Sequence, residues 1–172
     1  MKLAIRLLVP ATAVALSLPL AFAPPAAAAG ATVTRYGSSL SFSALAGARN
    51  QVTVDVVGGV LRVTDTSDIV PGPGCRPLSA TTVTCGSAAG LTRFTVVLRD
   101  AADSLAFASP LTAAVTLDAG TGSDSVAGSN GADTVFLRDG TTDTVTCGAG
   151  TDLVVADPVD NVGAGCEQVV RS

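Results

Sequence analysis

Apolar and polar residues alternate along positions 30–98, and this period of two predicts β-strands. The clearest run covers residues 51–57, Gln-Val-Thr-Val-Asp-Val-Val, and is rich in β-branched side chains. Gly58-Gly59 follows it, and residues 60–64 form a second strand-like run directly after these glycines. Two such runs joined by two glycines are typical of a β-hairpin, so we expect antiparallel pairing here.

Two more strands are expected in this half, at residues 81–84 and 92–98. From Asp100 onward the apolar runs become shorter: Asp103-Ser-Leu105 looks like a degenerate repeat, and residues 114–117 form a short strand. No low-complexity linker separates the two halves of the sequence. We therefore expect the N-terminal strands to stack on the C-terminal part as a cap.

A repeat of nine to ten residues occupies positions 119–155, and each copy ends in aspartate, one intervening residue and valine. The aspartates are Asp124, Asp133, Asp143 and Asp152, at steps of 9, 10 and 9 residues. Residues 119–127 and 128–136 are contiguous nonapeptides, and a third good copy begins at Cys147. The copy that ends at Asp143 carries one extra residue. A fixed short period with a glycine-rich half and an apolar half predicts a stack of similar structural units.

These repeats resemble the RTX, or hemolysin-type, calcium-binding nonapeptides, whose pattern is G-G-x-G-x-D-x-U-x with U a large apolar residue. The resemblance covers residues 118–155 well and 156–172 loosely, and it does not extend to the N-terminal half. It implies a short parallel β-roll in which two nonapeptides make one coil and calcium lies between successive turns. It also implies a set of metal-binding residues: Asp124, Asp133, Asp143, Asp152, Gly120, Gly122, Gly128, Gly131, Gly148 and Gly150.

The residue types in the repeat suit a hard cation. Glycine lets a turn adopt positive φ and bring main-chain carbonyls close to an ion, and aspartate adds an anionic oxygen that calcium prefers. Asp124 and Asp143, and likewise Asp133 and Asp152, are 19 residues apart, which is one coil of the implied roll. Stacked strands lie about 4.8 Å apart, so these carboxylates would repel each other without a cation. We therefore expect calcium binding to be coupled to folding.

The four cysteines are expected to form two disulfides. Three pairings are possible, and the local one, Cys75–Cys85 with Cys147–Cys166, is favoured. Cys147 and Cys166 are also 19 residues apart, so a continuing coil would place them one above the other. A metal site built from cysteines is the weaker alternative, because the chain has no histidine and no C-x-x-C spacing.

Residues 1–29 have the layout of a secretory signal peptide. Lys2 and Arg6 precede a mostly apolar stretch, and Ala27-Ala-Ala29 offers small residues for cleavage. We therefore expect a secreted protein with no membrane span in its mature part. Residues 118–172 carry nine acidic residues against Arg138 and Arg171, whereas residues 30–117 are nearly balanced. Acidity that coincides with the repeat favours a cation as partner and disfavours nucleic acid.

The expected fold class is all-β, with a short parallel β-roll in the C-terminal half and a strand-rich N-terminal cap. The expected segments are residues 1–29 (signal peptide), 30–99 (cap) and 100–172 (calcium-binding β-roll). The absence of histidine and of a phosphate-binding loop disfavours an enzyme. Two other interpretations stay open: a calcium-independent structural β-solenoid, and an extracellular interaction module with a protein or surface partner that the sequence does not identify.

Overall fold

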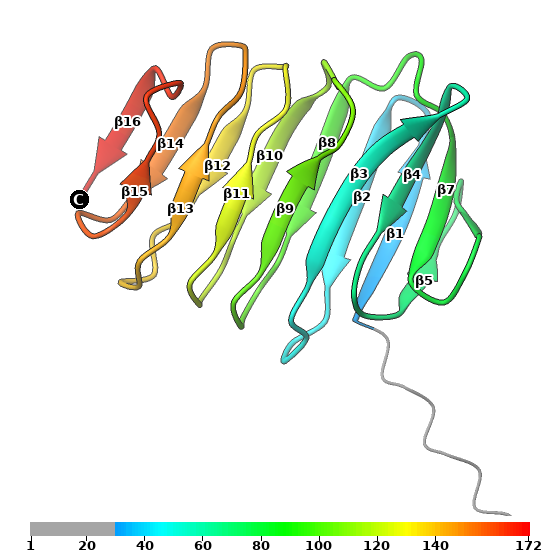
Figure 1. The fold of residues 1–172 in the computed structure, drawn as a ribbon, viewed down its shortest axis with the longest axis horizontal. Helices are drawn as coiled ribbons and strands as arrows, with labels where there is room; N and C mark the ends of the chain where they lie inside the picture. Colours follow the sequence, from blue (N-terminus) through cyan, green and yellow to red (C-terminus); the bar gives the residue numbers. More distant parts are fainter. Residues whose placement is uncertain (1–29) are drawn as a thin grey trace, which may run out of the picture.

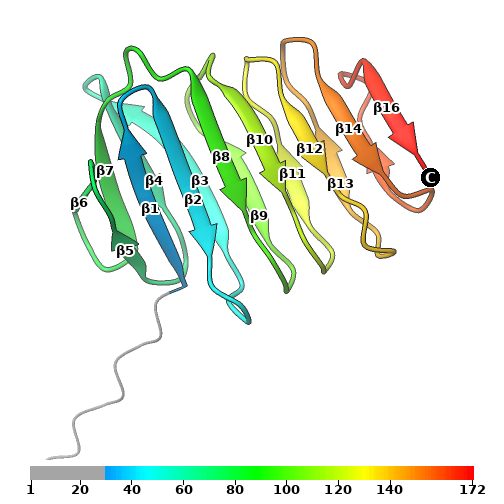
Figure 2. The same ribbon diagram turned by 180° about the vertical axis from the view of Figure 1, so that it is seen from behind.

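The computed structural model describes residues 30–172, and within this range the chain forms sixteen β-strands and no helix. The predicted all-β class is therefore confirmed. The expected signal peptide lies outside the described residues. The strands form two eight-stranded sheets, which Figures 1 and 2 show from opposite sides.

We call the two sheets A and B and give their strands in spatial order. Sheet A contains β16 (Gln168–Arg171), β14 (Leu153–Ala156), β12 (Thr134–Phe136), β10 (Ala114–Asp118), β8 (Arg93–Val97), β2 (Ser39–Ala44), β1 (Ala31–Tyr36) and β5 (Ile69–Pro71). Sheet B contains β15 (Asn161–Val162), β13 (Thr144–Thr146), β11 (Ser125–Ala127), β9 (Ser104–Phe107), β3 (Gln51–Val57), β4 (Val60–Thr64), β7 (Thr82–Ser87) and β6 (Arg76–Pro77).

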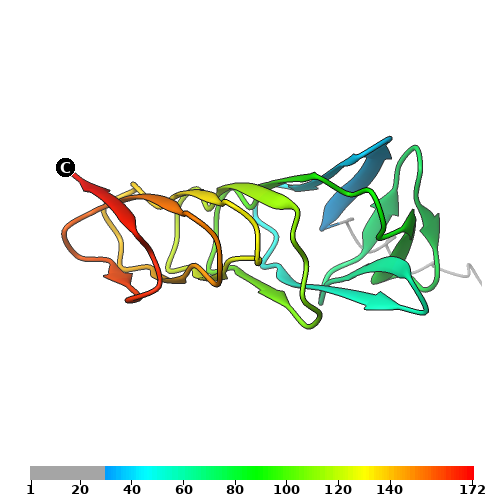
Figure 3. The same cartoon turned by 90° about the horizontal axis from the view of Figure 1, so that it is seen from above.

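From β8 onward, successive strands alternate between the sheets, and each pairs in parallel with the strand two positions later in the chain. We call one strand of sheet A, one strand of sheet B and the two turns that follow them a coil. Figure 3 shows the coils side by side along a flattened tube. Thr134 pairs with Leu153, and Ser125 pairs with Thr144. Both pairs are 19 residues apart, the separation that the sequence predicted for one coil.

The N-terminal half extends both sheets. The hairpin predicted for residues 51–64 is confirmed: β3 and β4 pair antiparallel, and Gly58 and Gly59 between them have φ of 58° and 79°. Positive φ at both positions gives a turn whose twist matches that of the strands. Strand β2 pairs in parallel with β8, and β3 pairs in parallel with β9. The expected stacking of N-terminal strands on the repeat is thus present.

One hydrophobic core runs between the sheets through both halves. In the repeat, each short strand contributes one inward valine, and the fully or almost fully buried examples are Val126, Val135, Val145 and Val154. Burying a valine side chain contributes about 1.5–3 kcal/mol, so the core gains stability in similar steps along the tube. The N-terminal half uses larger side chains, and Phe94 packs edge to face on Phe107 with ring centroids 6.2 Å apart.

Two disulfides tie the ends of the tube, and they pair the cysteines as expected. Cys75 is bonded to Cys85, and Cys147 is bonded to Cys166. The Cα atoms of the second pair are 5.2 Å apart, about the spacing of stacked strands. Disulfides of this kind are more typical of extracellular proteins. Between residues 30 and 172 there is no helix with the length and apolar character needed to span a bilayer.

Candidate functional site

The acidic residues of the repeat gather at the two edges of the tube, where the chain turns from one sheet to the other. We define the first edge by the turns at residues 45–50, 98–103, 119–124, 137–143 and 157–160, which lead from sheet A to sheet B. The second edge comprises the turns at 108–113, 128–133, 147–152 and 163–167, which lead back to sheet A. Most of these turns end in an acidic residue immediately before a strand begins.

These terminal residues form two columns along the tube. The first column, on the first edge, contains Asn50, Asp103, Asp124, Asp143 and Asp160. The second column, on the second edge, contains Asp133, Asp152 and Glu167. The pairs expected from the sequence, Asp124 with Asp143 and Asp133 with Asp152, are therefore one coil apart on a common edge. Asp143 keeps its place in the column although its repeat carries an extra residue.

Each carboxylate in the first column accepts a hydrogen bond from the main chain of the preceding coil. The N–H of Asp103 donates to Asp124 Oδ1, and the N–H of Asp124 donates to Asp143 Oδ1, both at 2.8 Å. The N–H of Asp143 donates to Asp160 Oδ1 at 3.0 Å. These N–H groups lie at the ends of strands, where ladder pairing stops. A short acidic side chain directly before the strand is suited to accept them.

The second column repeats this arrangement. Val115 N–H donates to Asp133 Oδ1 at 2.7 Å, and Asp133 N–H donates to Asp152 Oδ1 at 2.8 Å. Asp152 N–H donates to Glu167 Oε2 at 2.9 Å. Both columns therefore link successive coils through one charge-assisted hydrogen bond per turn, a stronger bond than one between neutral groups.

Several column carboxylates are buried with one oxygen unsatisfied. The exposed fraction is 3% for Asp103 and Asp124 and 0% for Asp143 and Asp152. In each of these four residues Oδ2 has no hydrogen-bond partner among the described residues. Within residues 30–172 the one ion pair joins Arg62 to Asp55. No arginine in this range is therefore paired with a column residue. Ionised columns thus lack a directly paired cation, and buried charge of this kind is costly.

The pKa values reflect this cost. Burial raises the pKa of Asp124 and of Asp143 to about 6, in both cases against the lowering effect of the hydrogen bond from the preceding coil. Neighbouring carboxylates add to the rise: Asp103 acts on Asp124, and Asp124 acts on Asp143. Burial likewise raises the pKa of Asp103 to about 6. A bound cation or a proton would relieve the same repulsion.

Asp133 differs from the other predicted ligands because protein groups satisfy both of its oxygens. Its Oδ2 accepts the N–H of Ser129 at 2.6 Å, and its Oδ1 accepts the Ser129 hydroxyl at 3.0 Å in addition to Val115 N–H. Ser129 stands where the nonapeptide pattern has its second glycine. The first column therefore offers more open carboxylate oxygens than the second.

The predicted turn glycines are required by close packing between coils. A Cβ at Gly120 would lie 1.8 Å from Arg99 O, and one at Gly148 would lie 2.0 Å from Ser129 O. The sequence also predicted positive φ, which holds for Gly120, Gly122, Gly148 and Gly150, with values of 83°, 133°, 95° and 134°. It does not hold for Gly128 and Gly131. At these two positions the approach of a neighbouring carbonyl oxygen excludes a side chain.

Carbonyl oxygens near these glycines already accept hydrogen bonds along the tube. Arg99 O accepts the N–H of Thr121 at 2.6 Å, and Ser129 O accepts the N–H of Ala149 at 3.3 Å. A carbonyl oxygen has two lone pairs, so such a bond leaves one for an ion. Across residues 30–172, no three His, Cys, Asp or Glu side chains converge on one point that would suit a metal ion. A cation at either column would therefore take part of its coordination from main-chain oxygens or water.

Two further acids on the first edge serve the turns. Asp139 Oδ2 accepts Gly122 N–H at 2.8 Å, and Asp157 Oδ2 accepts the N–H groups of Asp139 and Gly140 at 2.9 and 2.6 Å. Asp118 is exposed. Asn50 is a column member that the repeat pattern did not predict. The only signal is that Asn50-Gln-Val52 has the spacing of the Asp-x-Val repeat with asparagine in place of aspartate.

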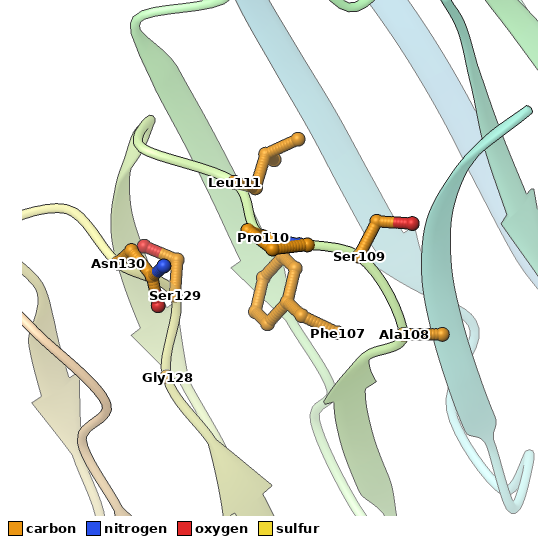
Figure 4. Close-up of a pocket in the computed structure, with 8 residues that line it drawn as sticks. All are labelled: Phe107, Ala108, Ser109, Pro110, Leu111, Gly128, Ser129 and Asn130. Atoms are coloured by element: carbon orange, nitrogen blue, oxygen red, sulfur yellow. The ribbon is translucent and has the colours of Figure 1, made fainter. Parts of the chain in front are cut away.

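A hollow on the surface lies beside the loop that connects β9 to β10 (Figure 4). Phe107 and Pro110 lie on one side of it, and Ser129 and Asn130 lie on the other. None of its eight lining residues carries a charged side chain. The hollow therefore contains none of the column carboxylates.

In comparisons with known proteins, no family model, no curated protein and no solved structure matches this chain. Functional inference therefore depends on the columns themselves.

Proposed function

We propose that this chain is a secreted calcium-binding β-roll, in which calcium lies between coils and is coupled to folding. The observation that supports the proposal most directly is the row of buried, unsatisfied carboxylate oxygens at Asp124, Asp143 and Asp152. Buried polar atoms normally have partners, and hard anionic oxygens are the ligands that calcium prefers. The two disulfides and the N-terminal layout support export.

Asp124 and Asp143 are the best ligand candidates, because each has a free Oδ2 and the two lie one coil apart. Asp152 has a free oxygen, but its neighbour Asp133 is satisfied by Ser129. Calcium takes six to eight oxygens, and each coil of the repeat supplies one carboxylate to each column. A site with few charged ligands binds weakly, and we expect a Kd of about 10⁻⁴–10⁻³ M, as in extracellular modules.

A calcium-independent structural β-solenoid is the second candidate. It is favoured by the hydrogen bond that each column carboxylate accepts, because these bonds join the coils without a metal. The Cys147–Cys166 disulfide joins the last coils in addition. An extracellular interaction module is compatible with both candidates, since the coils would then serve as a scaffold for an unidentified partner.

Calorimetric titration of the chain with calcium chloride separates the first two candidates. We expect a saturable isotherm in the range of 0.1–1 mM, weaker binding of magnesium, and a rise in Tm with calcium. The double variant Asp124→Asn/Asp143→Asn keeps the side-chain acceptors but removes two charges, and its affinity should fall at least about tenfold. Asp118→Asn is the matched control, because Asp118 is exposed. An absent isotherm together with an unchanged Tm would support the structural solenoid.

A further inference from the structure

The first column continues beyond the repeat into the N-terminal half. Asp103, before β9, and Asn50, before β3, occupy the same position in their turns as Asp124 does. Gln51 pairs with Ser104, so Asn50 and Asp103 are direct neighbours across the junction between the cap and the coils. Asn50 N–H donates to Asp103 Oδ1 at 2.7 Å, which places this carboxylate beside Asn50.

The junction contains two unsatisfied buried oxygens of different chemistry. Asn50 is 0% exposed and its Oδ1 has no partner in residues 30–172, while Asp103 is 3% exposed and its Oδ2 also has none. One is a neutral amide oxygen and the other is a carboxylate oxygen. Both types are common calcium ligands.

Hydrogen bonds fix the orientation of the Asn50 amide. Its Nδ2 donates to Asp65 Oδ2 at 2.5 Å and to Gly30 O at 3.4 Å. Both partners are acceptors only, so the NH₂ group has to face them and Oδ1 has to face away. Gln51 N–H and Thr66 N–H donate to the other oxygen of Asp65 at 2.7 Å. Asp65 thus holds the Asn50 amide through Oδ2, while its Oδ1 is occupied by these two main-chain groups.

The charge around the junction is mainly negative. The carboxylates of Asp65 and Asp100 act on Asp103 in the same direction as its burial, and both raise its pKa. Arg49 opposes them and is the one cation within residues 30–172 that does so. Its side chain is exposed, and its Nε donates to Ala102 O at 2.9 Å. Arg49 therefore leaves Oδ2 of Asp103 without a direct partner.

We propose that Asn50 Oδ1 and Asp103 Oδ2 are ligands of a separate calcium-class cation site that joins the cap to the coils. The site lies outside the nonapeptide repeat. The proposal rests on the proposed function, because the same ion would occupy this site and the sites in the repeat. Two ligands of one calcium ion are at most about 5 Å apart, and the hydrogen bond from Asn50 N–H to Asp103 Oδ1 places the two residues side by side. Binding here would make the stability of the cap depend on calcium as well.

Amide-resolved NMR during a calcium chloride titration of the chain tests this site. We expect saturable shifts at Asn50, Gln51 and Asp103, in addition to those at Asp124 and Asp143. Asp103→Asn retains an acceptor for Asn50 N–H, and it should abolish the shifts at 50–51, lower the calorimetric stoichiometry by one, and leave the shifts at Asp143. Asp118→Asn should change none of these.

A second variant tests the site through stability. Asn50→Asp adds a carboxylate at the junction, so it should lower the Tm without metal and roughly double the rise in Tm that calcium produces. Shifts at 50–51 that persist in Asp103→Asn, or an unchanged calcium response in Asn50→Asp, would overturn the junction site and leave the proposed function intact. If the chain and every variant bind no calcium, both proposals fail.

Discussion

At the scale of single residues, Ser129 shows how a departure from the repeat is accommodated. Its hydroxyl lies 2.9 Å from Ala113 O and 3.0 Å from Asp133 Oδ1, two acceptors that share its single hydrogen, and it accepts the N–H of Gly131 at 2.9 Å. The side chain is buried. In the sequence this position is a lost glycine, whereas in the structure its hydroxyl accepts Gly131 N–H and adds a third hydrogen bond to Asp133, whose oxygens also accept Val115 N–H and Ser129 N–H.

Ser129→Ala should therefore destabilise the protein. The substitution removes the acceptor of Gly131 N–H and one of the three hydrogen bonds that Asp133 accepts, and leaving a buried group such as Gly131 N–H unsatisfied costs about 1–3 kcal/mol. Chemical denaturation measures the change in the free energy of unfolding. Ser123→Ala, in an exposed turn position, is the control and should change it by less than about 0.5 kcal/mol. Equal effects of the two substitutions would contradict this role of Ser129.

Turn glycines allow a second test at this scale. Gly150 has φ of 134°, and a Cβ there would lie 2.3 Å from Gly131 O, whereas Gly140 has φ of 86° and open space. Gly140→Ala incurs backbone strain alone, about 1–2 kcal/mol. Gly150→Ala adds a clash with main chain and should cost more than about 3 kcal/mol. Thermal melts of both variants check the order, and a Gly140→Ala variant as unstable as Gly150→Ala would show that packing between coils is not the cause.

At the scale of elements, three neighbouring carboxyls of the first column respond to pH. The ordinary pKa of these carboxyls is 3.8, and burial raises it to about 6 in folded Asp103, Asp124 and Asp143. Between about pH 4 and pH 6 the folded state therefore binds more protons than the unfolded state. The free energy of unfolding of the metal-free protein should fall as pH rises through this window, by about 1–2 kcal/mol per carboxyl.

Calcium should flatten this dependence above pH 6, because it binds the ionised carboxylates. Melts at pH 4–8 with chelator and with excess calcium measure both profiles. Asp55 does not contribute to the pH dependence between pH 4 and pH 6, because its hydrogen bond to Arg62 lowers its pKa. Its own effect on stability therefore lies below this pH range. Asp124→Asn/Asp143→Asn should reduce the slope, and Asp118→Asn should not. A metal-free Tm that rises from pH 4 to pH 6 would contradict the assignment.

Elements also show what sequence alone can predict. The hairpin at residues 51–64, the one-coil separation of 19 and both disulfides followed from local patterns and spacing. The place of Asn50 in the first column did not follow from such patterns, because its neighbour Asp103 is 53 residues away along the chain. Strands β3 to β8 intervene, and no periodicity in the sequence spans a separation of that length. The role of Ser129 was hidden for a different reason, since a consensus pattern treats each substitution as a loss.

At the scale of the whole molecule, the described chain is a linear stack in which each coil contacts its neighbours. Stability in such stacks is approximately a sum of local terms, so a change at one end should remain near that end. The last coil is the weakest part. Val169 pairs with the fully buried Val154, yet it is itself 40% exposed, because β16 pairs only with β14 among the described strands. The Cys147–Cys166 disulfide lies at this end.

Replacing both Cys147 and Cys166 with alanine should therefore loosen the end of the tube without unfolding the cap. A disulfide that closes a loop of this size contributes about 3 kcal/mol. Hydrogen exchange should accelerate in β15 and β16 and remain slow in β2 and β8, at the centre of the stack. The matched variant, alanine at Cys75 and Cys85, removes the bridge at the opposite end and should accelerate exchange in β6 and β7 instead. Uniform acceleration of hydrogen exchange by either variant would show that the tube unfolds as a single cooperative unit. In that case, stabilisation of one end by bound calcium would also stabilise the other end.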